Sequence, residues 1–244
     1  MIITVFTGNG IRHNYLINQL KKFFEKVYVV KEVPILTKDI NSDILKRYFE
    51  NVKKAEKSVF FEKEKNKIKV EEIILSYGEL KNIELKKIEK VLNSDIYIVF
   101  GSSYIKGELI DFLIDKNCIN LHMGISPYYR GSACNFWAQY DNRYSLIGGT
   151  IHKISKGLDS GDIIKIVKLP QGKYDKFEVG MIAVKRTIDT LIYLLREKKE
   201  VLNNNQKQLK EKEIRYSKIR DFTEEHAKIF LKKYAENPII EIIN

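Results

Sequence analysis

The stretch that decides the fold is CINLHMGISPYYRG, at residues 118–131. Its first residues, 118–121, form a short apolar run, which is typical of a buried strand. Side chains two positions apart on a strand share one face, so Asn120 and His122 should point into the same space at a strand end. The residues that follow predict a loop with special backbone demands: Gly124, Ser126, Pro127 and Gly131.

A second strand is predicted further along the chain, at residues 146–154, and it contains the pair Gly148 and Gly149. A glycine pair inside a strand often marks close approach by a ligand or by another chain. The polar loop SKGLDSGD follows and carries Asp159 between two glycines. We therefore expect an amide, an imidazole and a carboxylate to converge at strand ends.

These three side-chain types together favour acyl-type chemistry. An imidazole can move a proton, and an amide can donate a hydrogen bond to a developing oxyanion. A carboxylate can orient the imidazole or raise its pKa through its opposite charge. Because the sequence has no serine in a G-x-S-x-G context, the set favours direct transfer to an amine over a covalent acyl-enzyme.

The motifs of this region resemble those of the folate-dependent formyltransferase family, which includes methionyl-tRNA formyltransferase, glycinamide ribonucleotide formyltransferase and the nucleotide-sugar N-formyltransferases. The family motifs are Asn-x-His, Pro-x-Tyr-Arg-Gly, Thr-x-His and Leu-Asp-x-Gly. They stand here at residues 120–122, 127–131, 150–152 and 158–161. The resemblance is strong over residues 95–170. Many members carry serine two places after the motif histidine, where this chain has Gly124.

The resemblance implies an α/β fold, a Rossmann-like formyltransferase domain with a mostly parallel twisted sheet and a short C-terminal appendage. It implies 10-formyltetrahydrofolate as the formyl donor, no metal, and catalytic roles for Asn120, His122 and Asp159. In the family, the chain after the strand at 95–100 passes along the pterin of the folate, although the same loop without the catalytic motifs would be an ordinary β–α connection. The predicted cofactor-binding residues are Ser103, Tyr104, Ile105, His152 and Gly157.

The N-terminal residues predict a strand at 2–6, a glycine turn, and a helix at 12–24 with apolar residues at helical spacing. Free backbone N–H groups at such a turn can bind an anion. The turn lacks a full G-x-G-x-x-G, however, and an ordinary β–α turn is the alternative. The resemblance places this turn beside the acceptor substrate. The predicted substrate-binding residues are Gly8, Asn9, Gly10, Arg12, His13, Tyr128, Arg130 and Trp137.

The remaining elements complete an α/β pattern. Strands are predicted at 26–31, 95–100 and 162–169, and helices at 85–92, 108–114, 133–140 and 177–195. The charged region 37–66 has helical spacing with a solvated face, and 68–76 is an apolar run of uncertain class.

Two units are expected: a catalytic domain at residues 1–200 and a short C-terminal segment at 201–244. Within that segment, 214–219 is predicted as a strand and 223–234 as a helix with Thr223 as its N-cap. The apolar end at 238–243 is expected to dock on the domain or on a second subunit.

Composition limits the classes of partner. Of 244 residues, 44% are hydrophobic and 31% charged, and 43 Lys and Arg against 32 Asp and Glu give a net charge of +11. These values fit a globular protein with anionic partners, or a lysine-rich surface that only favours solubility. Nucleic acid is not expected as a partner, because basic and aromatic residues do not interleave in a stripe. The four histidines show no metal-ligand spacing.

Cys118 and Cys134 are too few for a disulfide framework and are expected to be reduced, which fits a cytoplasmic protein. The sequence shows no signal peptide and no apolar run of about 18 residues, so no membrane partner is expected.

The acceptor amine is judged from the resemblance. The transfer-RNA enzyme of the family carries a further β-domain, for which residues 201–244 are too few. The sequence HMGISPYYRGSACNFW is more similar to the nucleotide-sugar branch, whose members often add a short C-terminal segment used in dimer contacts. We therefore expect a homodimer that binds folate and a dTDP-linked 4-amino or 3-amino deoxysugar destined for surface polysaccharide. Glycinamide ribonucleotide and methionyl-tRNA are the alternatives.

Overall fold

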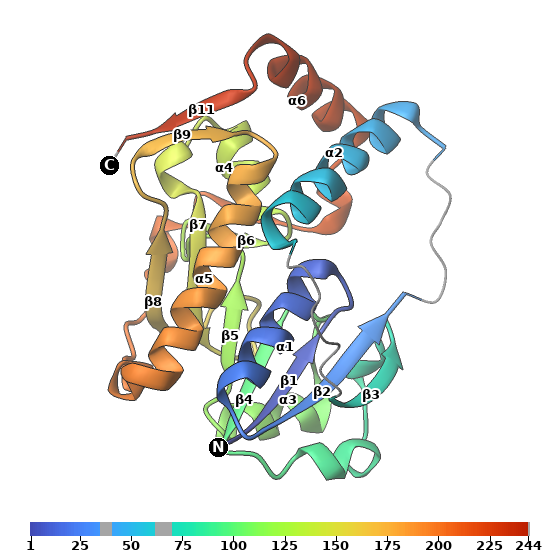
Figure 1. Ribbon diagram of the computed structural model, residues 1–244, viewed down its shortest axis with the longest axis vertical. Helices are drawn as coiled ribbons and strands as arrows, with labels where there is room; N and C mark the ends of the chain where they lie inside the picture. The colour runs from blue at the N-terminus through green and yellow to red at the C-terminus, as the bar shows by residue number, and fades with distance from the viewer. Residues whose placement is uncertain (35–40, 62–69, 244) are drawn as a thin grey trace.

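Seven strands form one sheet in a computed structural model that describes residues 1–34, 41–61 and 70–243. The strands lie in the order β3-β2-β1-β4-β5-β7-β8 (Figure 1). All pairs from β3 to β5 are parallel, and β7 and β8 are antiparallel to their neighbours. The predicted Rossmann-like α/β class with a mostly parallel sheet is therefore confirmed. The strand bounds are β1 Ile2–Thr7, β2 Lys26–Val33, β3 Glu71–Ser76, β4 Ile96–Phe100, β5 Ile119–His122, β7 Gly148–Lys153 and β8 Ile163–Lys168.

Helices connect these strands and cover both faces of the sheet. The α-helices are α1 Ile11–Phe23, α2 Asp43–Phe60, α3 Gly107–Asp115, α4 Cys134–Tyr140, α5 Glu178–Glu197 and α6 Glu224–Glu236. The 3₁₀ helices are η1 Glu79–Lys81, η2 Leu85–Val91, η3 Tyr144–Leu146, η4 Lys199–Asn203, η5 Lys210–Lys212 and η6 Ile219–Asp221.

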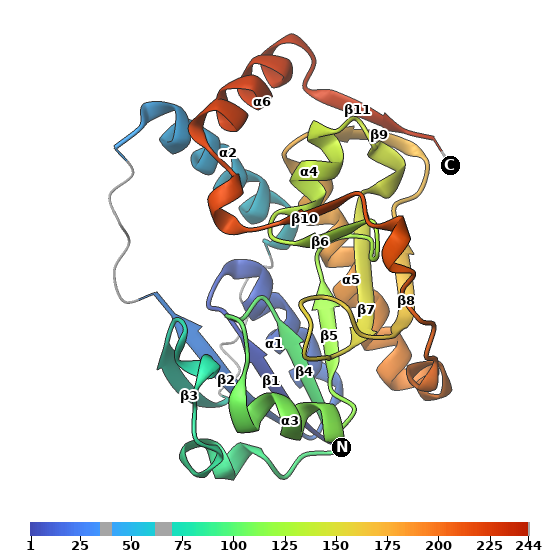
Figure 2. The ribbon, with the colours of Figure 1, turned by 180° about the vertical axis from the view of Figure 1, so that it is seen from behind.

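The core lies on both sides of the sheet. Helices α1 and α5 cover one face (Figure 1), where Leu16 and Leu191 pack with buried strand residues such as Val5. Helix α3 and the 3₁₀ helices η1 and η2 cover the other face (Figure 2), where Leu109 packs with Phe6. Parallel strands buried on both faces read as continuous apolar runs rather than as alternating patterns. This explains why the runs IITVFT and IYIVF predicted strands correctly.

The structure corrects several predicted elements. The helix predicted at 85–92 is the 3₁₀ helix η2, and the run of uncertain class at 68–76 forms strand β3 from residue 71 onward. In the charged region 37–66, α2 begins after Ser42, whose side chain accepts a hydrogen bond from the Leu45 N–H. The parts of that prediction at 37–40 and 62–66 lie outside the described residues.

The C-terminal segment returns to the body of the molecule and adds to two small sheets. Strand β10 (Arg215–Ser217) pairs in parallel with β6 (Tyr129–Gly131), and β11 (Ile239–Ile242) pairs antiparallel with β9 (Gly172–Asp175). Helix α6 lies beside α2 (Figures 1 and 2). The division at residue 200 and the dimer contacts of this segment stay predictions. Among the described residues, no helix has the length and apolar character needed to span a membrane.

Candidate active site

The site lies at the ends of β5 and β7, where β5 changes from a parallel to an antiparallel partner. Strand β5 carries Asn120 and His122, and the register of β5 with β7 sets Asn120 directly opposite His152. Directly opposed side chains on neighbouring strands are close enough to interact. The Nδ2 atom of Asn120 lies 3.0 Å from Nε2 of His152.

Asp159 reaches this pair from the loop after β7. Its Oδ1 accepts a hydrogen bond from Asn120 Nδ2 at 3.3 Å, and its Oδ2 lies 3.3 Å from His122 Nδ1. Oδ2 also accepts from the Gly131 N–H at 3.0 Å. Asp159 has a φ of +48°, a left-handed conformation that aspartate adopts more readily than most residues. The structure thus brings together all three residues for which the sequence predicted catalytic roles.

The hydrogen bonds fix the proton positions on His152 and the orientation of the Asn120 amide. His152 Nδ1 lies 2.7 Å from the carbonyl oxygen of Lys153, which can only accept, so this nitrogen carries a proton. His152 Nε2 is then the acceptor for Asn120 Nδ2, whose second hydrogen goes to Asp159. The Asn120 Oδ1 atom keeps no partner among the described residues, so it is available to a ligand.

His122 is held as a double donor. Its Nε2 lies 3.0 Å from the backbone oxygen of Tyr129, and its Nδ1 faces Asp159. Burial alone would lower the pKa of His122, but the Asp159 carboxylate outweighs burial and raises that pKa well above its usual value. Burial would likewise raise the pKa of Asp159, but the His122 imidazolium holds it well below its usual value. The site therefore contains a buried imidazolium–carboxylate pair.

Gly124 leaves space beside His122 that the side chain of Cys134 fills. A Cβ atom at position 124 would lie 2.4 Å from Cys134 Cβ and 2.8 Å from His122 Nε2. Both distances are too short for a side chain at 124 without a shift of its neighbours. Where many formyltransferases carry serine, this chain instead places a thiol, whose Sγ lies 3.4 Å from the Gly131 oxygen.

A cavity of about 850 Å³ opens in front of this group. Asn120, His122 and Asp159 line it, and so does the whole predicted cofactor-binding set: Ser103, Tyr104, Ile105, His152 and Gly157. The volume lies in the range of small-molecule sites. Among the described residues, no group of three or more His, Cys, Asp or Glu is arranged to hold a metal ion.

Glu32 anchors the loop that carries Ser103, and sequence reasoning missed it. This carboxylate is 1% exposed and accepts from the Ser103 N–H at 2.6 Å and from the Ser103 hydroxyl at 2.7 Å. It also accepts from the Gly78 N–H at 2.8 Å. A glutamate near the end of an apolar strand gives no signal of burial in the sequence, because its partners lie 46 and 71 residues away.

Only one of the predicted substrate-binding residues lines the cavity. Arg12 lines the cavity and pairs with Glu56 at 3.0 Å. The other predicted members lie outside the lining: Gly8, Asn9, Gly10, His13, Tyr128, Arg130 and Trp137. His13 accepts from the Gly10 N–H at 2.9 Å, and burial, followed by the charges of Arg12 and Lys31, lowers its pKa to about 3. A neutral His13 offers no charge to a phosphate, which favours the ordinary β–α turn that the sequence left open.

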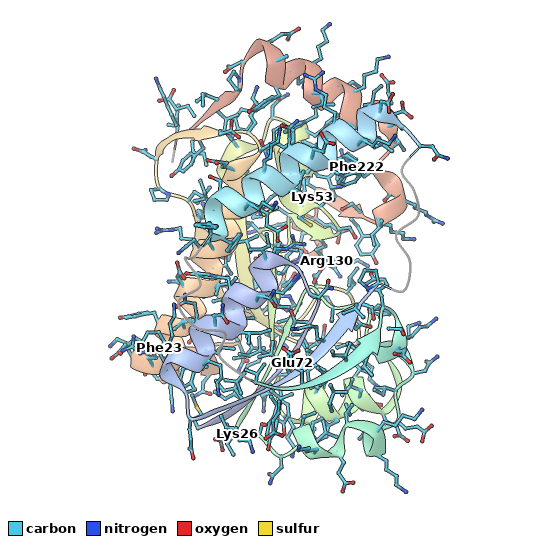
Figure 3. The ribbon with its side chains drawn as sticks, turned by 45° about the vertical axis from the view of Figure 1, so that its right-hand side comes forward. Phe23, Lys26, Lys53, Glu72, Arg130 and Phe222 are labelled. Atoms are coloured by element: carbon cyan, nitrogen blue, oxygen red, sulfur yellow. The ribbon has the colours of Figure 1, made fainter. Side chains whose placement is uncertain are left out.

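Arg130 and Trp137 are engaged by the protein itself. Arg130, labelled in Figure 3, has a side chain that is 13% exposed, with Nε 3.1 Å from the Leu158 carbonyl oxygen and Nη1 2.8 Å from a carboxylate oxygen of Glu213. Trp137 is 1% exposed and packs under the guanidinium of Arg215. Both side chains are thus held by contacts within the protein, and their direct contacts with substrate stay a prediction.

The far part of the cavity is an aromatic compartment that sequence reasoning also missed. Its rings come from α2, α4, α6, the residue before α5 and the segment after η6: Tyr48, Phe49, Phe136, Phe177, Phe222 and Phe230. Phe222 lies beside α2 (Figure 3), 4.8 Å between ring centres from Tyr48. Asn135 Nδ2 and Gln139 Oε1 belong to lining residues and are buried without a partner among the described residues. The other polar atom of each side chain bonds within the protein, Asn135 Oδ1 to the Gly148 N–H and Gln139 Nε2 to the Asn135 carbonyl oxygen.

No protein-family model matches the chain. In sequence it is 33% identical to methionyl-tRNA formyltransferase from Lachnospira eligens over 107 residues, 43% of this chain and 32% of that protein. It is 36% identical to the enzyme of the same name from Desulforamulus reducens over 77 residues, 32% of this chain and 24% of that protein. The matches thus span a third or less of the length of these relatives.

The solved structures that it resembles include sugar N-formyltransferases. A sugar N-formyltransferase from Shewanella sp FDAARGOS_354 has a TM-score of 0.57 at 18% identity, covering 91% of this chain and 78% of that one. The formyltransferase PseJ from Anoxybacillus kamchatkensis, in complex with UDP-4,6-dideoxy-4-formamido-L-AltNAc and tetrahydrofolate, has a TM-score of 0.55 at 18% identity, covering 98% and 94%. The resemblance to the folate-dependent formyltransferases is therefore confirmed in sequence over part of the chain, and in fold, as that of the sugar N-formyltransferases, over most of it.

Proposed function

We propose that this protein transfers the formyl group of 10-formyltetrahydrofolate to the amino group of a nucleotide-linked amino-deoxysugar. The observation that carries the proposal is the joining of Asn120, His122 and Asp159 at the wall of a cavity large enough for two substrates. Proximity of a donor and an acceptor in one cavity converts a bimolecular step into an effectively unimolecular one.

In this mechanism the amine nitrogen attacks the formyl carbon, and the carbonyl oxygen becomes an oxyanion. His122, protonated through its pairing with Asp159, supplies positive charge beside that oxyanion. The free Oδ1 of Asn120 accepts a hydrogen bond from the attacking amine and orients its lone pair. A new carbon–nitrogen bond forms as the bond from the formyl carbon to the folate nitrogen breaks.

One proton moves from the amine to the departing folate nitrogen. Asp159 and His122 are the two groups at the site that can relay it, directly or through water. The Nε2 atom of His152 holds the Asn120 amide in place. The loop with Ser103, Tyr104 and Ile105 borders the folate side of the cavity, supported from behind by Glu32.

The aromatic compartment supports a nucleotide sugar as acceptor. Its aromatic walls suit a planar nucleobase, which can stack on or pack edge-to-face against the rings. An N-formyltransferase from Helicobacter canadensis, solved with folinic acid and dTDP-3-aminofucose, has a TM-score of 0.55 at 17% identity, covering 91% of this chain and 73% of that one. We extend the proposal to a dTDP sugar, a cytoplasmic homodimer and a role in surface polysaccharide, as the sequence resemblance implies.

The test of the acceptor is a panel assayed with one formyl donor. Release of tetrahydrofolate is followed with dTDP-4-amino and dTDP-3-amino deoxysugars, their UDP counterparts, glycinamide ribonucleotide and methionyl-tRNA. We expect turnover with a dTDP-amino sugar and none with the other two classes. Turnover with glycinamide ribonucleotide would keep the chemistry and replace the acceptor; turnover with methionyl-tRNA alone would overturn the sugar proposal.

A further inference from the structure

The loop that presents Asp159 is held by side chains from distant parts of the chain. Gln208 donates both hydrogens of its amide, to the Asp159 carbonyl oxygen at 3.0 Å and to the Gly161 carbonyl oxygen at 2.7 Å. Arg130 donates to the Leu158 carbonyl oxygen from Nε at 3.1 Å. Three of the four carbonyl groups at 158–161 are thus bound from outside the loop.

Gln208 and the partner of Arg130 both belong to the C-terminal segment. Gln206 exchanges two backbone hydrogen bonds with Ile163, at 2.8 and 3.1 Å, which fixes the segment beside the start of β8. Glu213 then pairs with Arg130 at 2.8 Å, before β10 joins β6. Residues 206–217 therefore run along the loop and onto β6; in Figure 2 this segment leads from η4, below β8, up to β10.

The loop needs this support because its backbone is left-handed at Asp159 and because the Asp159 carboxylate must reach several partners. Asp159 has a left-handed φ of +48°, and its carboxylate serves His122, Asn120 and Gly131 at once. A small rotation of the loop backbone would separate the carboxylate from these partners. The Oε1 atom of Gln208 is buried without a partner among the described residues, an unfavourable state that is tolerated here while both amide hydrogens are used.

We propose that Gln208 is a positioning residue for Asp159, and that residues 206–217 form a strap that completes the active site. Glu213 acts in the same way from the other side, because it holds Arg130 against the Leu158 carbonyl group. The assignment of a rate effect rests on the proposed formyl transfer, whereas the effect on the His122–Asp159 pair does not.

The test compares Gln208→Glu and Gln208→Ala with the control Lys207→Ala. Glutamate keeps the shape of glutamine but places an oxygen where the donating amide stood, so it separates hydrogen bonding from packing. Lys207 is the neighbouring residue; its side chain is 82% exposed and pairs at the surface with the Asp162 carboxylate, so it binds none of the carbonyl groups at 158–161. Glu213→Gln provides a second route to the same loop if both Gln208 variants fold poorly.

Two readouts are measured in the full-length protein. The first is the pKa of His122 by NMR titration of the ring nitrogens, which we expect to fall by roughly one unit in the uncharged variant Gln208→Ala as Asp159 loses its position. The second is formyl transfer, where kcat should fall roughly tenfold to a hundredfold with the KM for folate changed little. Lys207→Ala should match the parent protein in both.

The outcomes separate the two proposals. If the parent protein transfers formyl to no acceptor, the proposed function fails, yet a lowered His122 pKa in Gln208→Ala would still support the strap. If folded Gln208→Glu and Glu213→Gln keep both the parent His122 titration and the parent kcat within about twofold, the strap is only packing and the positioning proposal is overturned.

Discussion

Oδ2 of Asp159 lies 3.3 Å from Nδ1 of His122, with the two side chains 9% and 5% exposed. The pairing shifts both pKa values in the direction of the charged forms, against the effect of burial. A buried pair of this kind is strongly destabilised when one partner is removed, because the other charge is left uncompensated. Four predictions follow from this pair and its surroundings.

Asp159→Asn should lower the pKa of His122 and flatten the pH dependence of stability. His122 has a raised pKa, so its contribution is full below its ordinary value of 6.5 and is lost as the pH rises through its folded value. Asp159 has a lowered pKa, so its contribution is full above its ordinary value of 3.8 and is lost as the pH falls through its folded value. Urea unfolding at several pH values should show the largest excess stability of the parent protein between these two ordinary values. An equal difference at every pH would contradict the charged pair.

Gly124→Ser should destabilise the protein through its contact with Cys134. The added Cβ meets Cys134 Cβ at 2.4 Å, and overpacking of this kind typically lowers the free energy of unfolding by about 1–3 kcal/mol. The double variant Gly124→Ser/Cys134→Gly removes the nearer obstructing atoms and should recover part of the loss, while the contact with His122 Nε2 at 2.8 Å remains. Thermal unfolding of the two variants and of Cys134→Gly alone checks this coupling. Additive effects of the two single changes would show that the space is not shared.

Glu32→Gln should weaken folate binding more than it slows turnover. In the parent protein the Glu32 carboxylate accepts hydrogen bonds from the Ser103 N–H and hydroxyl groups. The glutamine amide brings an NH₂ group toward these donors, so the Ser103 loop loses its anchor. We expect the KM for 10-formyltetrahydrofolate to rise roughly tenfold, since each tenfold factor corresponds to about 1.4 kcal/mol. The control is Glu72→Gln. Glu72 lies on β3, is labelled in Figure 3, and forms a partly exposed ion pair with Lys31. Similar KM values for 10-formyltetrahydrofolate in the two variants would show that Glu32 does not support folate binding.

Phe222→Ala should raise the KM for the acceptor and leave that for folate unchanged. Phe222 lines the aromatic compartment, whereas the Asn120–Asp159 group and the Ser103 loop border the other part of the cavity. Loss of one ring from such a site is expected to weaken acceptor binding by roughly 1–3 kcal/mol. Phe23→Ala is the matched control, because Phe23 is 46% exposed and stacks with Arg196 at the far end of α1 (Figure 3). Equal rises in both KM values for Phe222→Ala would place the acceptor elsewhere.

The sequence predicted the centre of the site because its geometry is local. Asn120 and His122 share one strand, so their common direction follows from the period of a strand. His152 joins them because β7 is the next strand in the sheet. The left-handed Asp159 lies in a loop between two glycines, where the motif and the backbone demands coincide.

The supports of the site were not predictable in the same way. Gln208 lies 49 residues from Asp159, and Glu32 lies 71 residues from Ser103, so no periodicity connects them. The charges of α2 predicted only a solvated helix, yet Tyr48 on its inner face lines the cavity. Arg130 had the motif of a binding residue, but Glu213 and the Leu158 carbonyl group engage it. Contacts between distant segments depend on packing that one sequence does not specify.

The most direct test of the central claim is transfer of a ¹³C-labelled formyl group. The protein is incubated with [¹³C-formyl]10-formyltetrahydrofolate and dTDP-amino sugars, and the products are analysed by mass spectrometry and NMR. The account predicts a labelled formamide on the sugar nitrogen, formed at a rate that falls roughly 10²-fold in folded Asn120→Ala, because the attacking amine loses the group that orients it. Labelled product formed equally fast by Asn120→Ala, or folate bound without transfer to any amine, would contradict it.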